Sequence, residues 1–371
     1  MTRLNYWASS CVHTTLMLGS LALLSCGSDS EGIVSPSAPV IPAPELSLTF
    51  SGAITKSFLG ERGVMEFNLA VLTQMDPIQP LINVAAGDLS FTVTSVTNLQ
   101  GIPQSTEITL SPTQVINPPS SLVAEPLQLS LLMDGSGSLF VTDQQDLRFE
   151  AAFGLVEQYR SNPLDLGAIL RFDNQDTGFG TTALGRPLQT AQLLQDFTAD
   201  RFDLERGILG ATAGGDTALF DATVEAGQLL SDFSQEDGIN RRLVVFTDGI
   251  DNDSNLSLNE AIAELQALPN GLEPGLSVYI IGLGTALELF DLQQLARSTE
   301  GTFVLALLPQ QLDTAFANLF PAAVGEQRVE VSVASTSPLP AGEYLLDGQI
   351  TLSRDGEQIT TNFVDATLIV P

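Results

Sequence analysis

Positive charge and nitrogen ligands are scarce in this chain of 371 residues. It has 14 Lys and Arg against 44 Asp and Glu, a formal net charge of −30. Because such a surface repels nucleic acid and anionic lipid headgroups, we expect no nucleic-acid partner. The single histidine is His13. The rest of the chain therefore has no histidine for a Ser-His-Asp or Cys-His catalytic site or for metal coordination.

The apolar run near the N-terminus, residues 14–24, is too short to span a bilayer, which takes about 20 residues. It follows a start that contains Arg3 and no acid, and it has the length of a signal-peptide core. The run ends in "LLSC", which resembles a bacterial lipobox, whose cysteine is lipidated and becomes the first residue. We expect residues 1–25 to be a signal peptide and Cys26 to carry the lipid. An ordinary secretory signal is the alternative.

The sequence that follows Cys26 is typical of a tether. Residues 26–45 are rich in Ser, Pro and Gly, which predicts a semi-extended linker. Gly27, rather than Asp, follows Cys26, which by resemblance to enterobacterial sorting favours the outer membrane. We therefore expect a cell-envelope protein that meets the membrane through its lipid alone. The mature chain would have no second cysteine for a disulfide.

Three blocks follow along the chain. Residues 46–125 contain strand-like runs separated by Pro and Gly, without a helical period. From 126 to 322, apolar strands alternate with amphipathic helices, which predicts an α/β domain with a doubly wound, mostly parallel sheet. Residues 323–371 return to strands, with a hairpin signal at Asp355-Gly356.

We expect the last block to complete a β-sandwich that begins at residue 46, because it is too small for a core of its own. The α/β domain would then be an insertion, which the neighbouring termini of doubly wound domains make easy. Two separate β units are the alternative. Within the α/β block, two pairs predict capping boxes at helix starts, Thr142 with Gln145 and Ser257 with Glu260.

Polar residues stand where elements of the α/β block begin or end. Asp134 ends the apolar run "LQLSLLMD", and Ser136 and Ser138 follow it on a glycine-rich turn. Asp248 ends a later apolar strand, and Thr217 opens a helix after two glycines. If the two strands are neighbours where the strand order reverses, both carboxylates face one crevice. Oxygen ligands of this kind suit Mg²⁺.

The segments "DGSGS", "GGDTALFDA" and "TDG" resemble the three loops of a von Willebrand factor type A domain. The resemblance covers residues 126–322 and implies a doubly wound fold with a metal-ion-dependent adhesion site. It implies that Ser136 and Ser138 ligate the metal directly and that Thr217 does so in the ligand-bound form. Asp134 and Asp248 would hold the metal, often through waters. Mg²⁺ is the expected ion, with Mn²⁺ or Ca²⁺ as alternatives.

Further acidic residues stand beside these segments. Asp216 takes a place where many bacterial relatives in the family have Gly, and it either adds charge near the site or faces solvent. The segment "DNDSNLSLNE" begins like a calcium loop with Asp251 and Asp253, but Leu256 replaces the required Gly and Ile262 the bidentate Glu. We interpret it as a solvated acidic loop that enters a helix. A weak Ca²⁺ site is the alternative.

The sequence therefore predicts a binding module rather than an enzyme. By resemblance, a protein partner would offer an exposed Asp or Glu carboxylate to the open position of the metal. One alternative is a metal-assisted hydrolase, in which the carboxylate cluster activates water and Asp216 is a conceivable base. Another is an envelope scaffold whose metal is only structural. Loss of partner retention in EDTA would distinguish adhesion from both.

Overall fold

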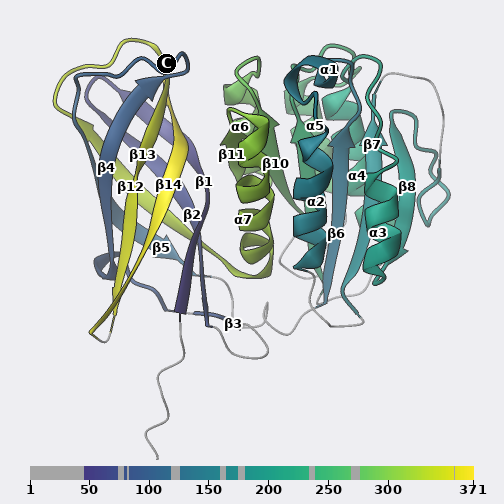
Figure 1. Ribbon diagram of the computed structural model, residues 1–371, viewed down its shortest axis with the longest axis horizontal. Coiled ribbons are helices and arrows are strands. Elements are labelled where there is room, and N and C mark those ends of the chain that lie inside the picture. The colour runs from purple at the N-terminus through teal and green to yellow at the C-terminus, as the bar shows by residue number, and fades with distance from the viewer. Residues whose placement is uncertain are drawn as a thin grey trace, which may run out of the picture. The chain divides into compact units, whose positions relative to one another are not determined.

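The computed structural model describes residues 46–73, 79–81, 83–117, 126–158, 164–173, 180–233, 239–268, 276–354 and 356–371. They form an α/β region between two β segments (Figure 1). The predicted signal peptide, Cys26, the tether and Asp355 lie outside the described residues. Among the helices of the described part, none is both long and apolar enough to cross a membrane.

A six-stranded sheet forms the centre of the α/β region, in the order β11-β10-β9-β6-β7-β8. All neighbours pair in parallel except β7 and β8, which are antiparallel. This confirms the predicted doubly wound, mostly parallel sheet. The strands are β6 (Leu127–Asp134), β7 (Leu166–Phe172), β8 (Ala191–Thr198), β9 (Asn240–Thr247), β10 (Ser277–Leu283) and β11 (Phe303–Ala306).

The strand order reverses between β6 and β9. The chain leaves β6 for β7 and β8 on one side and then returns to β9 on the other. Asp134 ends β6, and Asp248 follows the last residue of β9. The two carboxylates therefore stand at neighbouring strand ends across the reversal, where open α/β sheets bind ligands.

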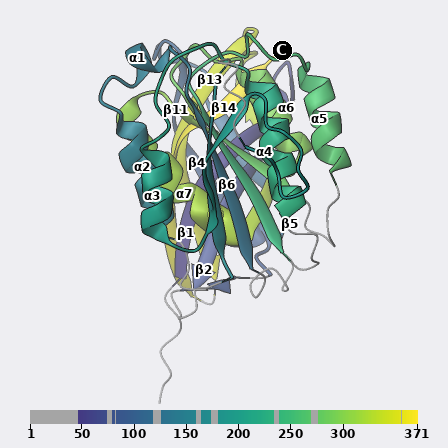
Figure 2. The same cartoon turned by 90° about the vertical axis from the view of Figure 1, so that its right-hand side faces the viewer.

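Helices cover both faces of this sheet (Figures 1 and 2). Apolar residues of α2, α3 and α7 share one core with it, and those of α4, α5 and α6 share the other. Because both faces are covered, β6 and β9 are buried at every residue, including their polar residues. The helices are α1 (Leu139–Thr142), α2 (Leu147–Glu157), α3 (Arg201–Ile208), α4 (Leu219–Phe233), α5 (Leu258–Ala267), α6 (Leu289–Ser298) and α7 (Leu312–Gly325), with a 3₁₀ turn η2 (Pro309–Gln311) before α7.

The two β segments build two antiparallel sheets together. The first has the order β1-β2-β12-β5, with β3 paired to β2, and the second has the order β14-β13-β4. A common core lies on the inner faces of both sheets, with Phe67 and Phe363 edge to face at 5.4 Å. The elements are β1 (Leu46–Leu59), β2 (Arg62–Thr73), β3 (Gln79–Pro80), η1 (Ala86–Asp88), β4 (Leu89–Asn98), β5 (Ile108–Ile116), β12 (Glu326–Ser335), β13 (Gly342–Arg354) and β14 (Glu357–Val370).

The chain enters and leaves the α/β region at adjacent points of one sheet. Ile116, the last residue of β5, is the pairing partner of Arg328 in β12. Helix α7 ends at Gly325 and β12 begins at the next residue. β12 thus fills the position between β2 and β5, so both sheets combine strands from the two ends of the chain.

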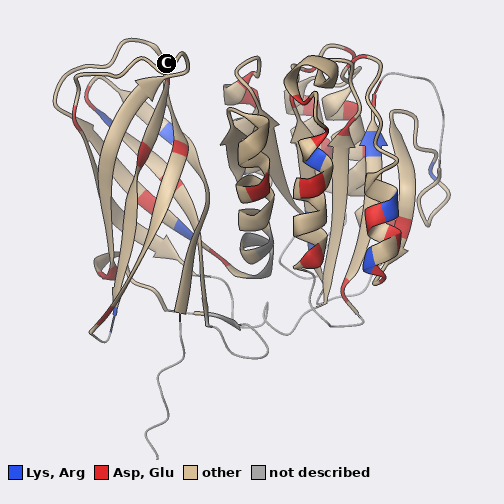
Figure 3. Ribbon diagram, viewed as in Figure 1, with Lys and Arg blue, Asp and Glu red and all other residues tan. Residues whose placement is uncertain are grey.

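Acidic residues are spread over both regions rather than confined to one (Figure 3). Most of the described Asp and Glu residues lie at element ends, in loops or on exposed helix faces. The large negative charge is therefore mainly a property of the solvated surface, where water and counterions screen it.

One of the two predicted capping boxes forms. The hydroxyl of Ser257 accepts from the backbone N–H of Glu260 at 3.4 Å, and the Glu260 carboxylate accepts from the Ser257 N–H at 2.8 Å. The reciprocal bonds begin α5 as the sequence pattern predicts.

The predicted Thr142–Gln145 capping box is wrong. A separate short helix, α1, ends at Thr142, and α2 begins only at Leu147. The carboxylate of Asp143 accepts from the first backbone N–H groups of α2 instead, at 2.9 Å from Leu147 N. Because the break between the helices follows Thr142, its hydroxyl is left to make a different contact, with Asp248.

Candidate metal centre

Three loops at the carboxyl edge of the α/β sheet hold the predicted site residues. We call residues 134–138 the first loop, 211–217 the second loop and 247–250 the third loop. They follow β6, α3 and β9. The first and third loops stand at neighbouring strand ends, and the second leads into α4.

Asp134 anchors the first loop from inside the protein. The residue is fully buried, and both carboxylate oxygens are occupied. Oδ1 accepts from the backbone N–H of Ser136 at 2.6 Å, and Oδ2 accepts from the hydroxyl of Thr247 at 2.7 Å. A Cβ at Gly135 would lie 2.4 Å from Nε of Arg171. Glycine is therefore needed where the first loop turns against β7.

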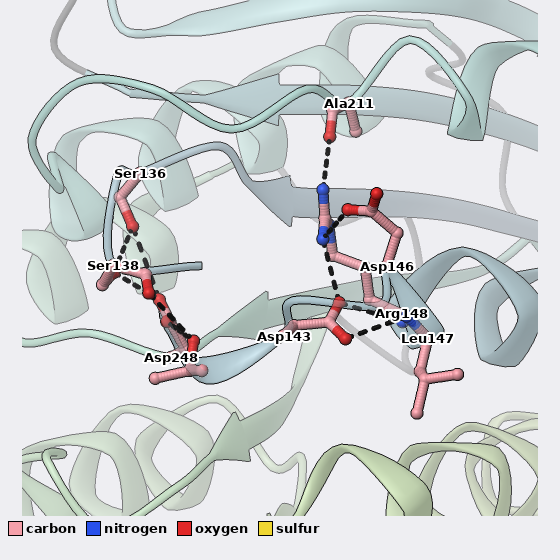
Figure 4. Close-up of polar contacts among 9 residues, drawn as sticks. Ser136, Ser138, Asp143, Asp146, Leu147, Arg148, Ala211 and Asp248 are labelled. Atoms are coloured by element: carbon pink, nitrogen blue, oxygen red, sulfur yellow. Dashed lines mark hydrogen bonds and ion pairs between the residues drawn. The ribbon is translucent and has the colours of Figure 1, made fainter. Parts of the chain in front are cut away.

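Hydroxyls of the first loop meet the carboxylate of the third. Ser136 Oγ and Ser138 Oγ lie 2.8 Å apart, and both donate to Oδ1 of Asp248, at 3.4 and 2.7 Å (Figure 4). The hydroxyl of Thr142 donates to the other oxygen, Oδ2. Ser136 and Asp248 are buried, whereas Ser138 is exposed. The cluster is thus open to solvent on the side of Ser138.

Backbone hydrogen bonds join the second loop to the first. The N–H of Gly214 donates to the carbonyl of Gly135 at 2.6 Å, and the N–H of Gly137 donates to the carbonyl of Gly215 at 2.9 Å. A Cβ at Gly137 would lie 3.4 Å from the Gly215 carbonyl oxygen. That distance is an ordinary van der Waals contact, so the glycines of the second loop are required by their backbone instead, with φ of 150° at Gly214 and 97° at Gly215. The two backbone bonds fix the second loop relative to Ser136 and Ser138.

Thr217 lies on the same side of the third loop as Ser138. A Cβ added at Gly249 would be 3.1 Å from the Thr217 hydroxyl oxygen and 3.7 Å from that of Ser138. Thr217 is buried, and its backbone N–H donates to the side-chain oxygen of Asn252 at 2.9 Å. The structure therefore brings all five predicted residues to one place, with Ser136, Ser138 and Asp248 in direct contact.

The charge balance of these loops suits a cation. Burial, with repulsion from the nearby Asp248 carboxylate, raises the pKa of Asp134 to about 6, although hydrogen bonds from Thr247 and Ser136 oppose the shift. Within the described part of the chain, no three His, Cys, Asp or Glu gather to hold a metal, so hydroxyls must complete the donor set. Two carboxylates and three hydroxyls form the all-oxygen set that a hard divalent ion such as Mg²⁺ prefers.

The additional acidic residues take different places. Asp216 and Asp253 are exposed, and the backbone N–H of Asp253 donates to the carbonyl of Thr217 at 3.2 Å. Asp251 is half-buried and accepts from the backbone N–H of Phe220 at 3.3 Å. Burial raises the pKa of Asp251, and a hydrogen bond from Ser254 lowers it. Asp251 thus holds its loop against the start of α4.

Sequence reasoning missed several residues that support the site. The hydroxyl of Thr247 is the one polar side chain near the end of the apolar stretch of β9. That position, directly before Asp248, could have identified Thr247 as a site residue. Thr142 gave no signal, because its contact depends on the break after α1. Arg148, a buried cation on α2, was also missed, and it donates to the carbonyl of Ala211 at the start of the second loop (Figure 4).

Comparison with known proteins gives structural likenesses alone. No family model and no curated protein matches the chain. A von Willebrand factor type A protein from Catenulispora acidiphila is 12% identical, with a TM-score of 0.42, over 88% of this chain and 74% of that chain. Proximal thread matrix protein 1 from the mussel byssus, in a structure with a zinc-occupied MIDAS motif, is 17% identical, with a TM-score of 0.43, over 56% and 48%.

The von Willebrand factor domain of the type V pili tip protein Mfa5 from Porphyromonas gingivalis is 14% identical, with a TM-score of 0.36, over 53% of this chain and 94% of that chain. The present chain spans about half the length of the mussel protein. The strand order, the helices on both faces and the three loops at the carboxyl edge give the α/β region a von Willebrand factor type A-like fold.

Proposed function

We propose that this protein is a cell-envelope binding module that uses a divalent metal to hold a protein partner. The observation that carries the proposal is the meeting of the Ser136 and Ser138 hydroxyls with the Asp248 carboxylate, beside buried Asp134. Asp134 and Asp248 would supply the charge, and Ser136, Ser138 and Thr217 would supply neutral oxygens. We propose Mg²⁺ as the ion, with Mn²⁺ or Ca²⁺ as alternatives.

The solvent side of the site suits a protein partner that presents an Asp or Glu carboxylate. Ser138 is exposed, so a partner group can reach the metal position from outside. Large apolar side chains next to the site residues are exposed as well, with 66% of Phe140, 74% of Val141 and 42% of Ile250 accessible. Exposed apolar side chains that gather on one surface are typical of protein-binding sites.

Localisation in the envelope is part of the same proposal. Cys26 would carry the lipid, and residues 26–45 would hold the folded part away from the membrane. The acidic surface would keep that part off anionic headgroups. We propose the outer membrane as the location, with the lipid as the only anchor.

The carboxylates near the candidate metal position fit a binding function better than a catalytic one. A metal-assisted hydrolase needs a base that can reach a metal-bound water. Asp134 is fully buried and both of its oxygens accept hydrogen bonds, and Asp216 is an exposed loop residue. These placements favour binding over the hydrolase alternative.

Chelation tests the adhesion function directly. The purified protein is immobilised and challenged with envelope extract from its native organism in Mg²⁺ or in EDTA. We expect a specific partner to be retained in Mg²⁺, released by EDTA and restored by Mg²⁺ or Mn²⁺. Changing the critical partner Asp or Glu to Asn or Gln should weaken binding. Thr217→Ala should weaken partner binding more than metal binding. A partner that ignores EDTA would contradict metal-mediated adhesion.

A further inference from the structure

Arg148 is a buried cation on the inner side of the metal loops. Only 1% of the residue is exposed. Its Nη1 lies 2.9 Å from Oδ2 of Asp143 and 2.7 Å from Oδ1 of Asp146, and its Nη2 donates to the carbonyl of Ala211 at 3.4 Å (Figure 4). Because a buried charge is costly unless it is paired, these partners hold the guanidinium in one place.

Asp143 connects this cation to the site carboxylate. Its side chain is fully buried, and besides pairing with Arg148 it accepts from the backbone N–H groups of Leu147 and Arg148, at 2.9 and 3.2 Å. The preceding residue, Thr142, donates to Asp248 and lies 3.2 Å from the carbonyl oxygen of Ser138. The position of Asp143 therefore fixes where the Thr142 hydroxyl meets Asp248.

Arg148 also reaches the second loop. Ala211, whose carbonyl accepts from Arg148, is the first residue of that loop. Further along, Gly214 and Gly215 exchange backbone hydrogen bonds with Gly135 and Gly137 of the first loop. Backbone bonds thus join the first and second loops at the site, and the guanidinium joins the second loop to Asp143 and Asp146.

We propose that Arg148 and Asp143 form a buried latch that positions the metal loops before any ion binds. We define the latch as this ion pair with its bonds to α2 and Ala211. It acts through Thr142 on Asp248 and through Ala211 on the second loop. Groups that orient metal ligands from behind commonly set metal affinity, because the ligands then need little ordering when the ion arrives. The effect on metal affinity rests on the proposed function, whereas the effect on the loops does not.

A matched control separates positioning from general stability. Asp232 is also a buried carboxylate paired with an arginine, at 3.2 Å from Nε of Arg186, and it accepts from the Thr182 hydroxyl at 2.6 Å. It lies near the C-terminal end of α4, about 20 Å along the helix from the second loop. Asp232→Asn removes the same charge from a buried carboxylate but leaves the latch intact.

Two measurements on the full chain compare three variants, Asp143→Asn, Arg148→Lys and Asp232→Asn. Hydrogen exchange in EDTA reports the opening of the first and second loops without metal, and calorimetric titration reports Mg²⁺ affinity. We expect both latch variants to exchange faster in these loops and to bind Mg²⁺ about 10-fold more weakly or worse. Arg148→Lys keeps the charge but loses the guanidinium fork. Asp232→Asn should leave both loop exchange and Mg²⁺ affinity at wild-type values.

Each outcome decides the proposal. If the latch variants show wild-type loop exchange and Mg²⁺ affinity, the latch does not position the loops. If Asp232→Asn loosens the loops equally, the effect is general stability and the proposal is wrong. If Asp143→Asn does not fold, Arg148→Lys and Asp146→Asn, which alters the exposed partner of the cation, carry the same comparison. If the wild type binds no Mg²⁺, the proposed function fails, while loop exchange in EDTA still decides the latch.

Discussion

Asp134 lies fully buried at the end of β6 with Asp248 as its charged neighbour, and its pKa is raised to about 6. An unfolded chain would release this proton near pH 3.9. Between these values the folded protein holds the proton more tightly than the unfolded chain does. Without metal, rising pH therefore removes stability across this window, by about 3 kcal/mol in total, and the loss is complete above about pH 6.

The loss of stability with rising pH leads to a prediction for Asp134→Asn in EDTA. The variant should be more stable than the wild type at pH 7, because one of two neighbouring buried charges is gone. Its advantage should shrink toward pH 4.5, where the wild-type carboxyl is protonated. Urea unfolding at the two pH values measures the difference. An equal difference at both values would mean that Asp134 does not carry the raised pKa.

The proximity of the five candidate site residues could be predicted because short motifs place them at strand ends and at a helix start. The residues that hold these five in place could not be predicted. Thr142 reaches Asp248 only because α1 ends there, and a break between two helices leaves no period to detect. Likewise, Arg148 interrupts an amphipathic helix, where a charge ordinarily indicates the solvent side; its burial depends on Asp143 and on a carbonyl distant in the sequence.

At the scale of elements, the sequence predicted fully buried strands better than half-buried ones. The strands β6, β9 and β10 are buried throughout, and each contains a short apolar stretch that the sequence shows, such as "LVVF" in β9 and "VYII" in β10. Strand β8 was not predicted: it is an antiparallel edge strand, mostly half-buried, and its sequence lacks an apolar run. The short helix α3 was missed as well, because eight residues carry little periodicity. The sequence pattern also could not predict which strands of the two β segments pair, because the register depends on contacts between residues far apart in the sequence.

The pairing of Ile116 with Arg328 yields a prediction about the β region. β5 and β12 are antiparallel neighbours, so a tight turn could join them directly in place of the α/β region. We expect residues 46–117 joined by a short Asn-Gly turn to residues 326–371 to fold, because this chain contains every strand of both sheets. Residues 46–117 alone should aggregate, since β2 and β5 would lose the strand between them.

Amide NMR spectra measure this difference. Dispersed signals from the joined chain and collapsed signals from residues 46–117 alone are the expected result. A well-dispersed spectrum from residues 46–117 alone would show that this segment folds without β12, β13 and β14, contrary to the shared sheets.

At the scale of the whole molecule, the sequence predicted an α/β region between β segments, and the structure shows that arrangement. Membrane association gives a prediction at this scale. With a net charge of −30, the protein should not adsorb to anionic lipid electrostatically, so its lipid alone should hold it. We expect the wild type to stay in the membrane fraction after a high-salt wash, and Cys26→Ser to be released or left uncleaved. Mass spectrometry that found the same lipid on the variant would refute anchoring at Cys26.

The central claim is that the three loops bind a divalent cation through Asp134, Ser136, Ser138, Thr217 and Asp248. Calorimetric titration of the purified protein with Mg²⁺ tests it most directly, with Asp248→Ala as the decisive variant. We predict one site in the wild type and none in Asp248→Ala, because that change removes a charge and the acceptor of two serine hydroxyls. Circular dichroism checks that the variant keeps its fold. Wild-type Mg²⁺ affinity in Asp248→Ala would contradict the proposed site.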